Sequence, residues 1–147
     1  MSQGAGQMGL LNDEDRDAFL SERRIGVLAI ERADAGPLTA PIWYRYTPDG
    51  GFEICMANAS AKAHLLRAAG RASICVQQEA FPYTYVTADG PVEMRVMTGD
   101  ERDDILREIA KRYLGEAGGN QYADAFPGHD EALVTLRPTR WRSEVLS

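Results

Sequence analysis

The chain has 147 residues, 44% of them hydrophobic and 26% charged, and its formal net charge is −6. This composition excludes a disordered chain, and the negative charge argues against nucleic acid as the main partner. The length suits a single domain with one core, which we expect to span residues 1–147. No apolar run approaches the roughly 20 residues that a transmembrane helix needs, so no membrane partner is expected.

The N-terminal part predicts a tail, a helix and a strand. Residues 1–10 lack the basic and apolar regions of a secretory signal, and we interpret them as a flexible tail on a cytoplasmic protein. Asn12 precedes three acidic residues, which is typical of a helix start. We expect this helix to end near Glu22 and to bury Ala18 and Phe19. The apolar run 25–30 predicts a core strand that pairs with the next strand as a hairpin.

The central part, residues 37–78, predicts strands around a helix. Leu38–Tyr46 alternates as a strand does, and Pro41 places it at an edge or a bulge, because proline donates no ladder hydrogen bond. The turn 47–51 has the proline and Asp-Gly chemistry of a hairpin and leads to a strand over 52–57. A helix then runs to Gly70, and a strand covers 72–78.

The join between that strand and that helix is a candidate anion site. Asn58 and Ser60 are both good N-cap residues, and Lys62 stands one turn into the helix. A helix N-terminus attracts anions because its first N–H groups have no partner inside the helix. The plainer interpretation is that Asn58 or Ser60 only caps the helix and that Lys62 is solvated. From residues 58–62 alone, the anion site and the plain cap have about equal weight.

The C-terminal part predicts a bent strand and a second long helix. Residues 83–97 form a long strand with a bend at Gly90-Pro91, as a small barrel needs at a corner. Thr98 and Glu101 have capping-box spacing, and the following helix is expected to end at Gly115. Residues 116–130 are expected to be the mobile part, with room for a short helix around 122–126. A closing strand follows at 132–136.

No side-chain arrangement for catalysis or metal binding is visible. The sequence has no Ser-His-Asp grouping, no P-loop and no dinucleotide fingerprint. Its two cysteines, Cys55 and Cys75, fall in strand patterns and suggest buried thiols rather than a disulfide. The two histidines, His64 and His129, lack metal-ligand spacing, so no metal is expected.

Several motifs together resemble the pyridoxamine-phosphate oxidase family and its flavin- and deazaflavin-dependent relatives. Ser60-Ala61-Lys62-Ala63 resembles the family's Ser-Arg-Lys-Ala phosphate motif. The run 40–45 has the spacing of the strand that lies along the isoalloxazine ring, and Cys55-Met56 matches the end of the next strand. The resemblance reaches from the first helix to the last strand. It implies a mainly β fold, the FMN-binding split β-barrel, with about six to seven antiparallel strands and flanking helices.

The resemblance also implies a set of cofactor-binding residues. They are Ala40, Pro41, Ile42, Trp43, Tyr44, Arg45, Cys55, Met56, Asn58, Ser60, Ala61, Lys62 and Tyr85. Trp43 could instead belong to the core or a subunit interface, and Tyr83 and Tyr85 could be core aromatics. No catalytic residue is expected among them, because in this family the cofactor carries the chemistry.

The cofactor implied is coenzyme F420, with FMN as the alternative. Ala61 stands where the flavin enzymes have arginine, and the single matched cation, Lys62, suits the phosphodiester of F420 better than the phosphate dianion of FMN. Arg67, Arg71 or an arginine of a partner subunit could complete an FMN site. We do not expect vitamin oxidase activity itself, because the family's C-terminal Arg-Leu-His signature is absent.

Two functions follow from the resemblance. One is an oxidoreductase that transfers hydride between the deazaflavin and a small organic substrate. It would be a homodimer with the site between subunits, where Trp43, Tyr83 and Trp141 are suited to an interface. The other is a barrel that binds haem or another cofactor without turnover, for which His64 and His129 are the available axial ligands.

Overall fold

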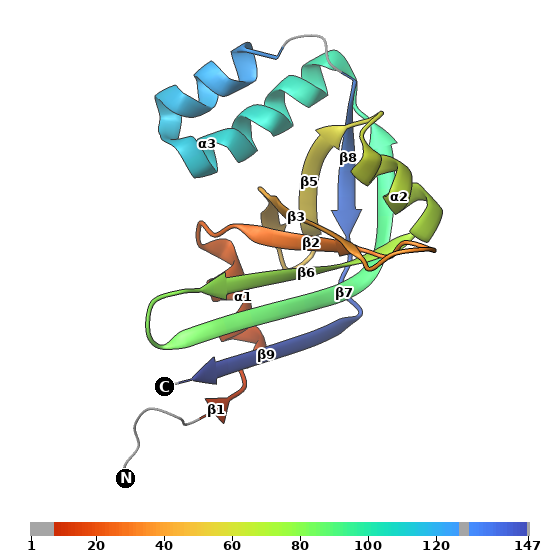
Figure 1. The fold of residues 1–147 in the computed structure, drawn as a ribbon. Coiled ribbons are helices and arrows are strands. Elements are labelled where there is room, and N and C mark those ends of the chain that lie inside the picture. Colours follow the sequence, from red (N-terminus) through yellow and green to blue (C-terminus); the bar gives the residue numbers. More distant parts are fainter. Residues whose placement is uncertain (1–7, 127–129, 147) are drawn as a thin grey trace.

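The computed structural model describes residues 8–126 and 130–146, which form one antiparallel sheet with three helices around it (Figure 1). The elements in chain order are β1 (Met8–Gly9), α1 (Asp13–Ser21), β2 (Gly26–Ile30), β3 (Leu38–Ile42), β4 (Arg45–Thr47), β5 (Gly51–Ala57), α2 (Ala61–Ala69), β6 (Arg71–Gln78), β7 (Tyr83–Val96), α3 (Gly99–Asp124), β8 (Glu131–Leu136) and β9 (Arg140–Leu146). The predicted fold class is confirmed. The described residues hold nine strands rather than about six to seven, because β1 and β4 are short and β9 was not expected.

The sheet curls upon itself because one strand serves both of its halves. Its order is β3-β2-β6-β7-β8-β5-β4, and β9 pairs with β1 and with β7. The first half of β7 lies between β6 and β9, and its second half pairs with β8. The predicted bend at Gly90-Pro91 lies where these pairings change. A Cβ at Gly90 would stand 2.1 Å from the carbonyl oxygen of Arg137, so only glycine fits this corner.

The N-terminal elements agree with expectation in position but not in every buried residue. Residues 1–7 of the expected tail lie outside the described residues, and Met8–Gly9 pair with β9. The Asn12 side chain caps α1 by accepting a hydrogen bond from the Asp15 N–H at 2.8 Å. Phe19 is buried as predicted, but Ala18 is exposed and Leu20 takes its place in the core. The last turn of α1 faces the sheet with its two large apolar side chains, which turns Ala18 to solvent.

The ring-contacting strand divides into two short strands. β3 pairs with β2 as the predicted hairpin and lies at the edge of the sheet, where Pro41 needs no further partner. The chain leaves the ladder at residues 43–44 and resumes as β4, which pairs with β5 across the predicted turn. This break frees Trp43 from regular strand geometry.

The two later helices begin as the sequence predicts, and one of them runs further. Ser60 caps α2, and Gly70 ends it in the left-handed region at φ 70°. Thr98 is the N-cap of α3, but its side chain makes no cap hydrogen bond, so the predicted capping box is incomplete. Gly115, at φ 82° and ψ 178°, interrupts α3 as expected. The chain is helical again up to Asp124, a longer second segment than the sequence indicated.

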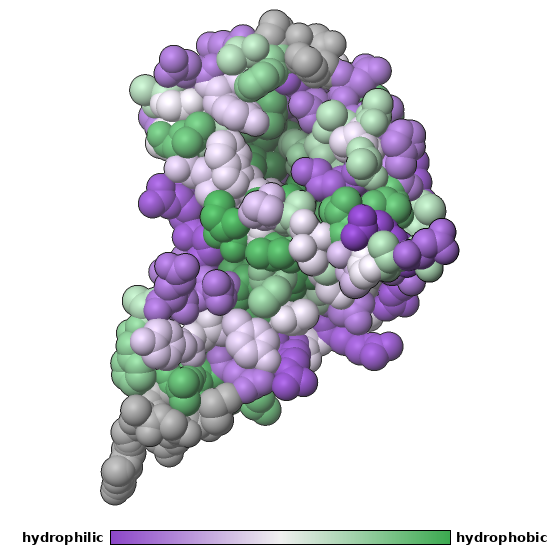
Figure 2. Space-filling model, in the orientation of Figure 1, coloured by the Kyte–Doolittle hydropathy of each residue, from purple (hydrophilic) through white to green (hydrophobic). Residues whose placement is uncertain are grey.

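The helices leave part of the sheet uncovered. Figure 1 shows α3 as two adjacent helical runs above one end of the sheet, with β1 and the end of β9 near the opposite end. Figure 2 shows apolar surface across the middle of the face that carries β2 and β3. Ile25, just before β2, is 46% exposed, and Val27, in β2, is 40% exposed. None of the helices in residues 8–126 and 130–146 has the length and hydropathy that a membrane span requires.

Candidate cofactor site

A pocket of about 220 Å³ brings together residues that the sequence placed at a cofactor site. Its lining residues are Pro41, Ile42, Trp43, Cys55, Lys62, Leu106, Ile109 and Tyr122. The first five were predicted and come from β3, β5, α2 and the loop after β3. The last three come from α3 and were missed. Leu106 and Ile109 belong to an apolar stripe with helical periodicity, and that signal indicates a buried face without saying what it faces.

One end of the pocket lies at the start of α2 and carries Lys62. The Ser60 hydroxyl oxygen accepts a hydrogen bond from the Ala63 N–H at 3.2 Å. Within the described residues, no group accepts from the N–H of Ala61 or Lys62. The half-buried Lys62 ammonium has no ion pair within the same residues, and the first turn of α2 carries no acidic side chain. Unpaired N–H groups beside a lysine at a helix start attract anions, so this end of the pocket is the candidate position for an anionic group.

Asn58 and the nearby arginines play different parts from Lys62. The Arg67 guanidinium donates to the carbonyl oxygen of Asn58 at 3.0 Å and to its side-chain oxygen. Asn58 is therefore held by Arg67, and Ser60 alone caps the helix. Arg67 lies beside the join but does not line the pocket. Arg71 pairs with Asp89 at 3.2 Å outside the pocket, so it adds no charge beside Lys62 in this chain.

The other end of the pocket is aromatic. The Trp43 ring stacks on Tyr113 with centroids 5.1 Å apart and an interplanar angle of 6°. Tyr122 contacts Trp43 at 5.2 Å, tilted by 52°. Both tyrosines come from α3, so Trp43 packs within its own chain as well as lining the pocket. Because Trp43 and Pro41 offer a flat apolar wall, this end suits an aromatic ring.

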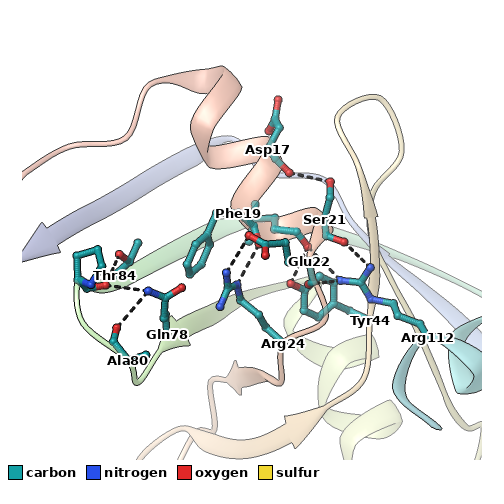
Figure 3. A network of polar contacts seen from close by, with 12 residues as sticks. Asp17, Phe19, Ser21, Glu22, Arg24, Tyr44, Gln78, Ala80, Thr84 and Arg112 are labelled. Carbon is teal, nitrogen blue, oxygen red and sulfur yellow. Dashed lines mark hydrogen bonds and ion pairs between the residues drawn. The ribbon is translucent and has the colours of Figure 1, made fainter. Parts of the chain in front are cut away.

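Tyr44 and Met56, two further predicted residues, lie behind the pocket in the core. Met56 is 5% exposed and Tyr44 is fully buried. The Tyr44 hydroxyl donates to the carbonyl oxygen of Leu20 at 2.8 Å, and its backbone N–H donates to the Tyr113 hydroxyl at 3.1 Å. Figure 3 shows Arg112 of α3 reaching the same end of α1, where it donates to the carbonyl oxygen of Ser21 at 2.7 Å. These contacts fix the wall of the pocket from behind.

Arg45 and Ala40 flank the pocket without lining it. The Arg45 guanidinium pairs with Glu53 at 2.6 Å and with Glu108 at 2.8 Å. Its charge is therefore neutralised by two carboxylates and does not add to that of Lys62. Ala40 is half-buried in the ladder opposite Leu28, and its contribution to the site is limited to the backbone of β3.

Comparison with known proteins decides the family. The sequence profile of pyridoxamine 5'-phosphate oxidase matches residues 13–144, which is most of the chain. The chain belongs to the pyridoxamine 5'-phosphate oxidase family. Solved structures agree with this fold. A conserved hypothetical protein of Mycobacterium tuberculosis is 20% identical, with a TM-score of 0.75 over 97% of this chain and 89% of that one.

Two further structures with this fold have names that mention cofactors. A protein described as an F420 reductase is 20% identical, with a TM-score of 0.67 over 86% of this chain and 94% of its own. A FAD- and haem-binding protein of Mycobacterium smegmatis is 19% identical, with a TM-score of 0.64 over 95% of this chain and 73% of that one. At these identities the likeness concerns the fold, and the cofactor of each is a property of that protein.

In this member of the pyridoxamine 5'-phosphate oxidase family, Cys55 lines the pocket with an uncharged thiol. Burial raises the pKa of its thiol to about 12, and the nearby Glu131 carboxylate adds to this effect. The thiol is therefore protonated near pH 7 and is a poor nucleophile. The described residues contain no grouping of histidine, cysteine and carboxylates that could hold a metal, and no disulfide. His64 is exposed on α2 and does not line the pocket, while His129 lies outside the described residues.

Tyr85 lies on a different part of this family member, away from the pocket of its own chain. Its hydroxyl donates to Glu144 at 2.5 Å and accepts from the Arg142 guanidinium at 2.8 Å. With Tyr83 it lines a separate cavity of about 400 Å³ beside the end of β9. Tyr85 therefore does not join Lys62 at one site within a single chain.

Proposed function

We propose that this protein is a cytoplasmic oxidoreductase that uses coenzyme F420 and transfers hydride between the deazaflavin and a small organic substrate. The observation that carries the proposal is the anion end of the pocket. Lys62 is the one cation among the described residues that line it, and the N–H groups of Ala61 and Lys62 are unpaired beside it. Ala61 replaces the arginine that the phosphate motif of the flavin enzymes contains.

The charge of the ligand separates the two cofactors. The terminal phosphate of FMN carries nearly two negative charges near pH 7, whereas the phosphodiester of F420 carries one. One lysine and two N–H groups match a single charge better than a double one. FMN is the second candidate, because the Arg67 guanidinium lies next to the join, at 3.0 Å from the Asn58 carbonyl oxygen. That arginine would have to leave Asn58 before it could reach a phosphate in the pocket.

The side chains of the pocket bind and orient, and the chemistry belongs to the cofactor. A bound deazaflavin accepts or gives a hydride and reacts poorly with oxygen. Trp43 and Ile42 form the wall along which its ring would lie, and Leu106 and Ile109 exclude water from the opposite side. Among the described residues that line the pocket, the neutral Cys55 thiol is no strong nucleophile, and Arg45, which flanks the pocket, is ion-paired and is no strong acid. An enzyme whose cofactor carries the reaction needs neither.

The test uses both reduced cofactors without oxygen. Reduced F420 and reduced FMN are each supplied anaerobically, and their reoxidation is followed against a panel of conjugated enones and quinones. We expect reoxidation of reduced F420 by at least one acceptor, and little oxygen consumption when air is admitted. Tight FMN binding with oxygen-dependent turnover and hydrogen peroxide, without measurable F420 affinity, would transfer the proposal to FMN.

The alternative to an oxidoreductase is a non-catalytic protein of the same fold that binds haem. The FAD- and haem-binding protein of similar fold favours including it in the same titration. Haem requires an axial ligand, and the histidine of the described residues, His64, is exposed outside the pocket. A haem spectrum with a histidine-ligated iron, lost in His64→Ala or His129→Ala, would favour that function over hydride transfer.

We further propose that two copies form a homodimer and complete the site between them. The pocket of one chain is smaller than the roughly 300–1,000 Å³ of typical small-molecule sites. Tyr83 and Tyr85 lie outside that pocket, and Tyr83 is 50% exposed. A partner placed over the uncovered sheet face would bring such residues to the open side of the pocket. Trp43 and Trp141 are already packed within the chain, Trp141 beneath the Arg16 guanidinium at 3.9 Å.

A further inference from the structure

The roof of the cofactor pocket is formed by one helical element. Leu106 and Ile109 come from the first segment of α3, before Gly115, and Tyr122 comes from the second segment, residues 116–124. Tyr122 lies against Trp43, the residue that forms the flat wall of the pocket. With Tyr122 in this place the cavity measures about 220 Å³, which is too small for a tricyclic ring with its ribityl chain.

The first segment of α3 is firmly attached to the rest of the protein. This segment buries the side chains of Leu106, Ile109 and Ala110. Its Tyr113 hydroxyl donates to the Arg24 carbonyl oxygen at 2.8 Å. Arg112 closes the C-terminal end of α1 through several carbonyl oxygens. This segment cannot move without exposing core side chains.

The second segment is held mainly by the first. Its buried residues are Gly119 and Ala123, and Gly119 packs directly on the backbone of Lys111. The Arg107 guanidinium joins the two segments by donating to Asn120 at 3.0 Å and to Asp124 at 2.7 Å. Contacts of this kind near the surface are individually weak.

Gly115 gives this segment a hinge. Its φ of 82° with ψ of 178° is a conformation that essentially only glycine adopts, and, apart from its chain neighbours and the adjacent helix backbone, no atom lies within 4 Å of the position of a Cβ there. Gly115 therefore has backbone freedom that a residue with a side chain would lack, and contacts of the second segment alone oppose its movement. Small backbone changes at Gly115 would move residues 116–124 as a body while the first segment stays in place.

We propose that residues 116–124 are a hinged cover of the pocket and that Tyr122 is the residue a flat tricyclic ring displaces from Trp43 on binding. The ring then stacks where the Tyr122 phenol lay, and the cover closes over it. This inference rests on the proposed function for the identity of the ring. The opening itself is a property of the free protein and can be measured without any ligand.

Hydrogen exchange of the free protein tests the opening. Backbone N–H groups of residues 116–124 should exchange at least about tenfold faster than those of 102–113, because the cover opens locally. Arg107→Ala should accelerate exchange in 116–124 by about a further tenfold and affect 102–113 much less, because there it removes only the surface pair of Arg107 with Asp103. The matched control is Arg95→Ala, which removes another arginine ion pair to α3, with Glu101, that does not join the two segments.

Binding kinetics test the role of Tyr122. In a Trp141→Phe background, Trp43 is the remaining tryptophan and reports ring binding by fluorescence quenching in stopped flow, with F420 and FMN as probes. Tyr122→Ala and Arg107→Ala should each raise the association rate several-fold, to about tenfold. Tyr122→Phe keeps the ring that contacts Trp43 and should bind like the parent protein.

The outcomes separate this inference from the proposed function. Equal exchange rates in the two segments, or equal acceleration of both by Arg107→Ala, would overturn the hinged cover whatever the ligand. Binding of a cofactor at rates unchanged by Tyr122→Ala, or weakened by it, would also overturn the displacement. If neither cofactor binds to any variant, the proposed function fails, while the exchange comparison still decides whether the cover opens.

Discussion

Lys62 is the residue on which the choice of ligand depends most directly. Lys62→Ala should raise the Kd of the cofactor about tenfold or more, because a charge-assisted contact contributes about 1.5–3 kcal/mol. The melting temperature of the cofactor-free protein should change little, since Lys62 has no ion pair within the described residues. Titration calorimetry with F420 and FMN measures the first effect, and a thermal scan measures the second.

Arg71→Ala is the matched control for that change. It also removes one positive charge close in sequence, but Arg71 pairs with Asp89 away from the pocket. The Kd of the Arg71→Ala variant for the cofactor should stay near the wild-type value. A loss of affinity in Lys62→Ala alone is then due to a local contact of Lys62 and not to the change in net charge. Equal Kd values for Lys62→Ala and the wild type with both cofactors would place the phosphate elsewhere.

At the scale of elements, Tyr44 joins α1, the break between β3 and β4, and α3. Its hydroxyl donates to Leu20 in the last turn of α1, and its N–H donates to Tyr113 of α3. The guanidinium of Arg112 lies over the Tyr44 ring at 5.2 Å. The wall of the pocket therefore depends on a buried phenol that no ligand touches.

Tyr44 predicts how stability responds to alkaline pH. Burial raises the pKa of Tyr44 from 10.0 to about 12, so the unfolded chain loses this proton at lower pH than the folded chain. The contribution to stability is complete below pH 10 and is lost as the pH rises towards 12. Urea unfolding between pH 8 and 12 should show a falling free energy of unfolding.

Tyr44→Phe isolates this contribution. At pH 8 the variant should lose about 0.5–1.5 kcal/mol, the net value of a hydrogen bond, and its decline above pH 10 should be shallower than that of the wild type. Some decline persists because burial also raises the pKa values of Tyr46 and Cys55. Parallel curves for variant and wild type would mean that Tyr44 ionises freely in the folded protein.

At the scale of the whole molecule, the site of one chain is open and small. We expect light scattering to give twice the mass of a single chain at micromolar concentration, as for a C2 homodimer. Tyr85→Ala should then weaken cofactor binding although Tyr85 is remote from Lys62 in its own chain. A monomer that keeps its cofactor would count decisively against the dimer.

Local signals in the sequence determined much of the fold. The Asn12 and Ser60 caps, the left-handed Gly70, the turn after Thr47 and the bend at Gly90 all appear where the residues predict them. Each depends on a few neighbouring residues, whose hydrogen bonds and backbone preferences act within one turn of chain. The same locality explains why the sequence could predict that Ser60 caps α2 and that Lys62 stands in its first turn.

The opposite side of the site was decided only by tertiary structure. Helical periodicity shows that Leu106 and Ile109 are buried, but it says nothing of the strand that they face. Tyr122 reaches Trp43 because α3 turns back at Gly115. Contacts between residues so far apart in sequence depend on how the elements dock, which follows from packing of the whole core and from no local pattern.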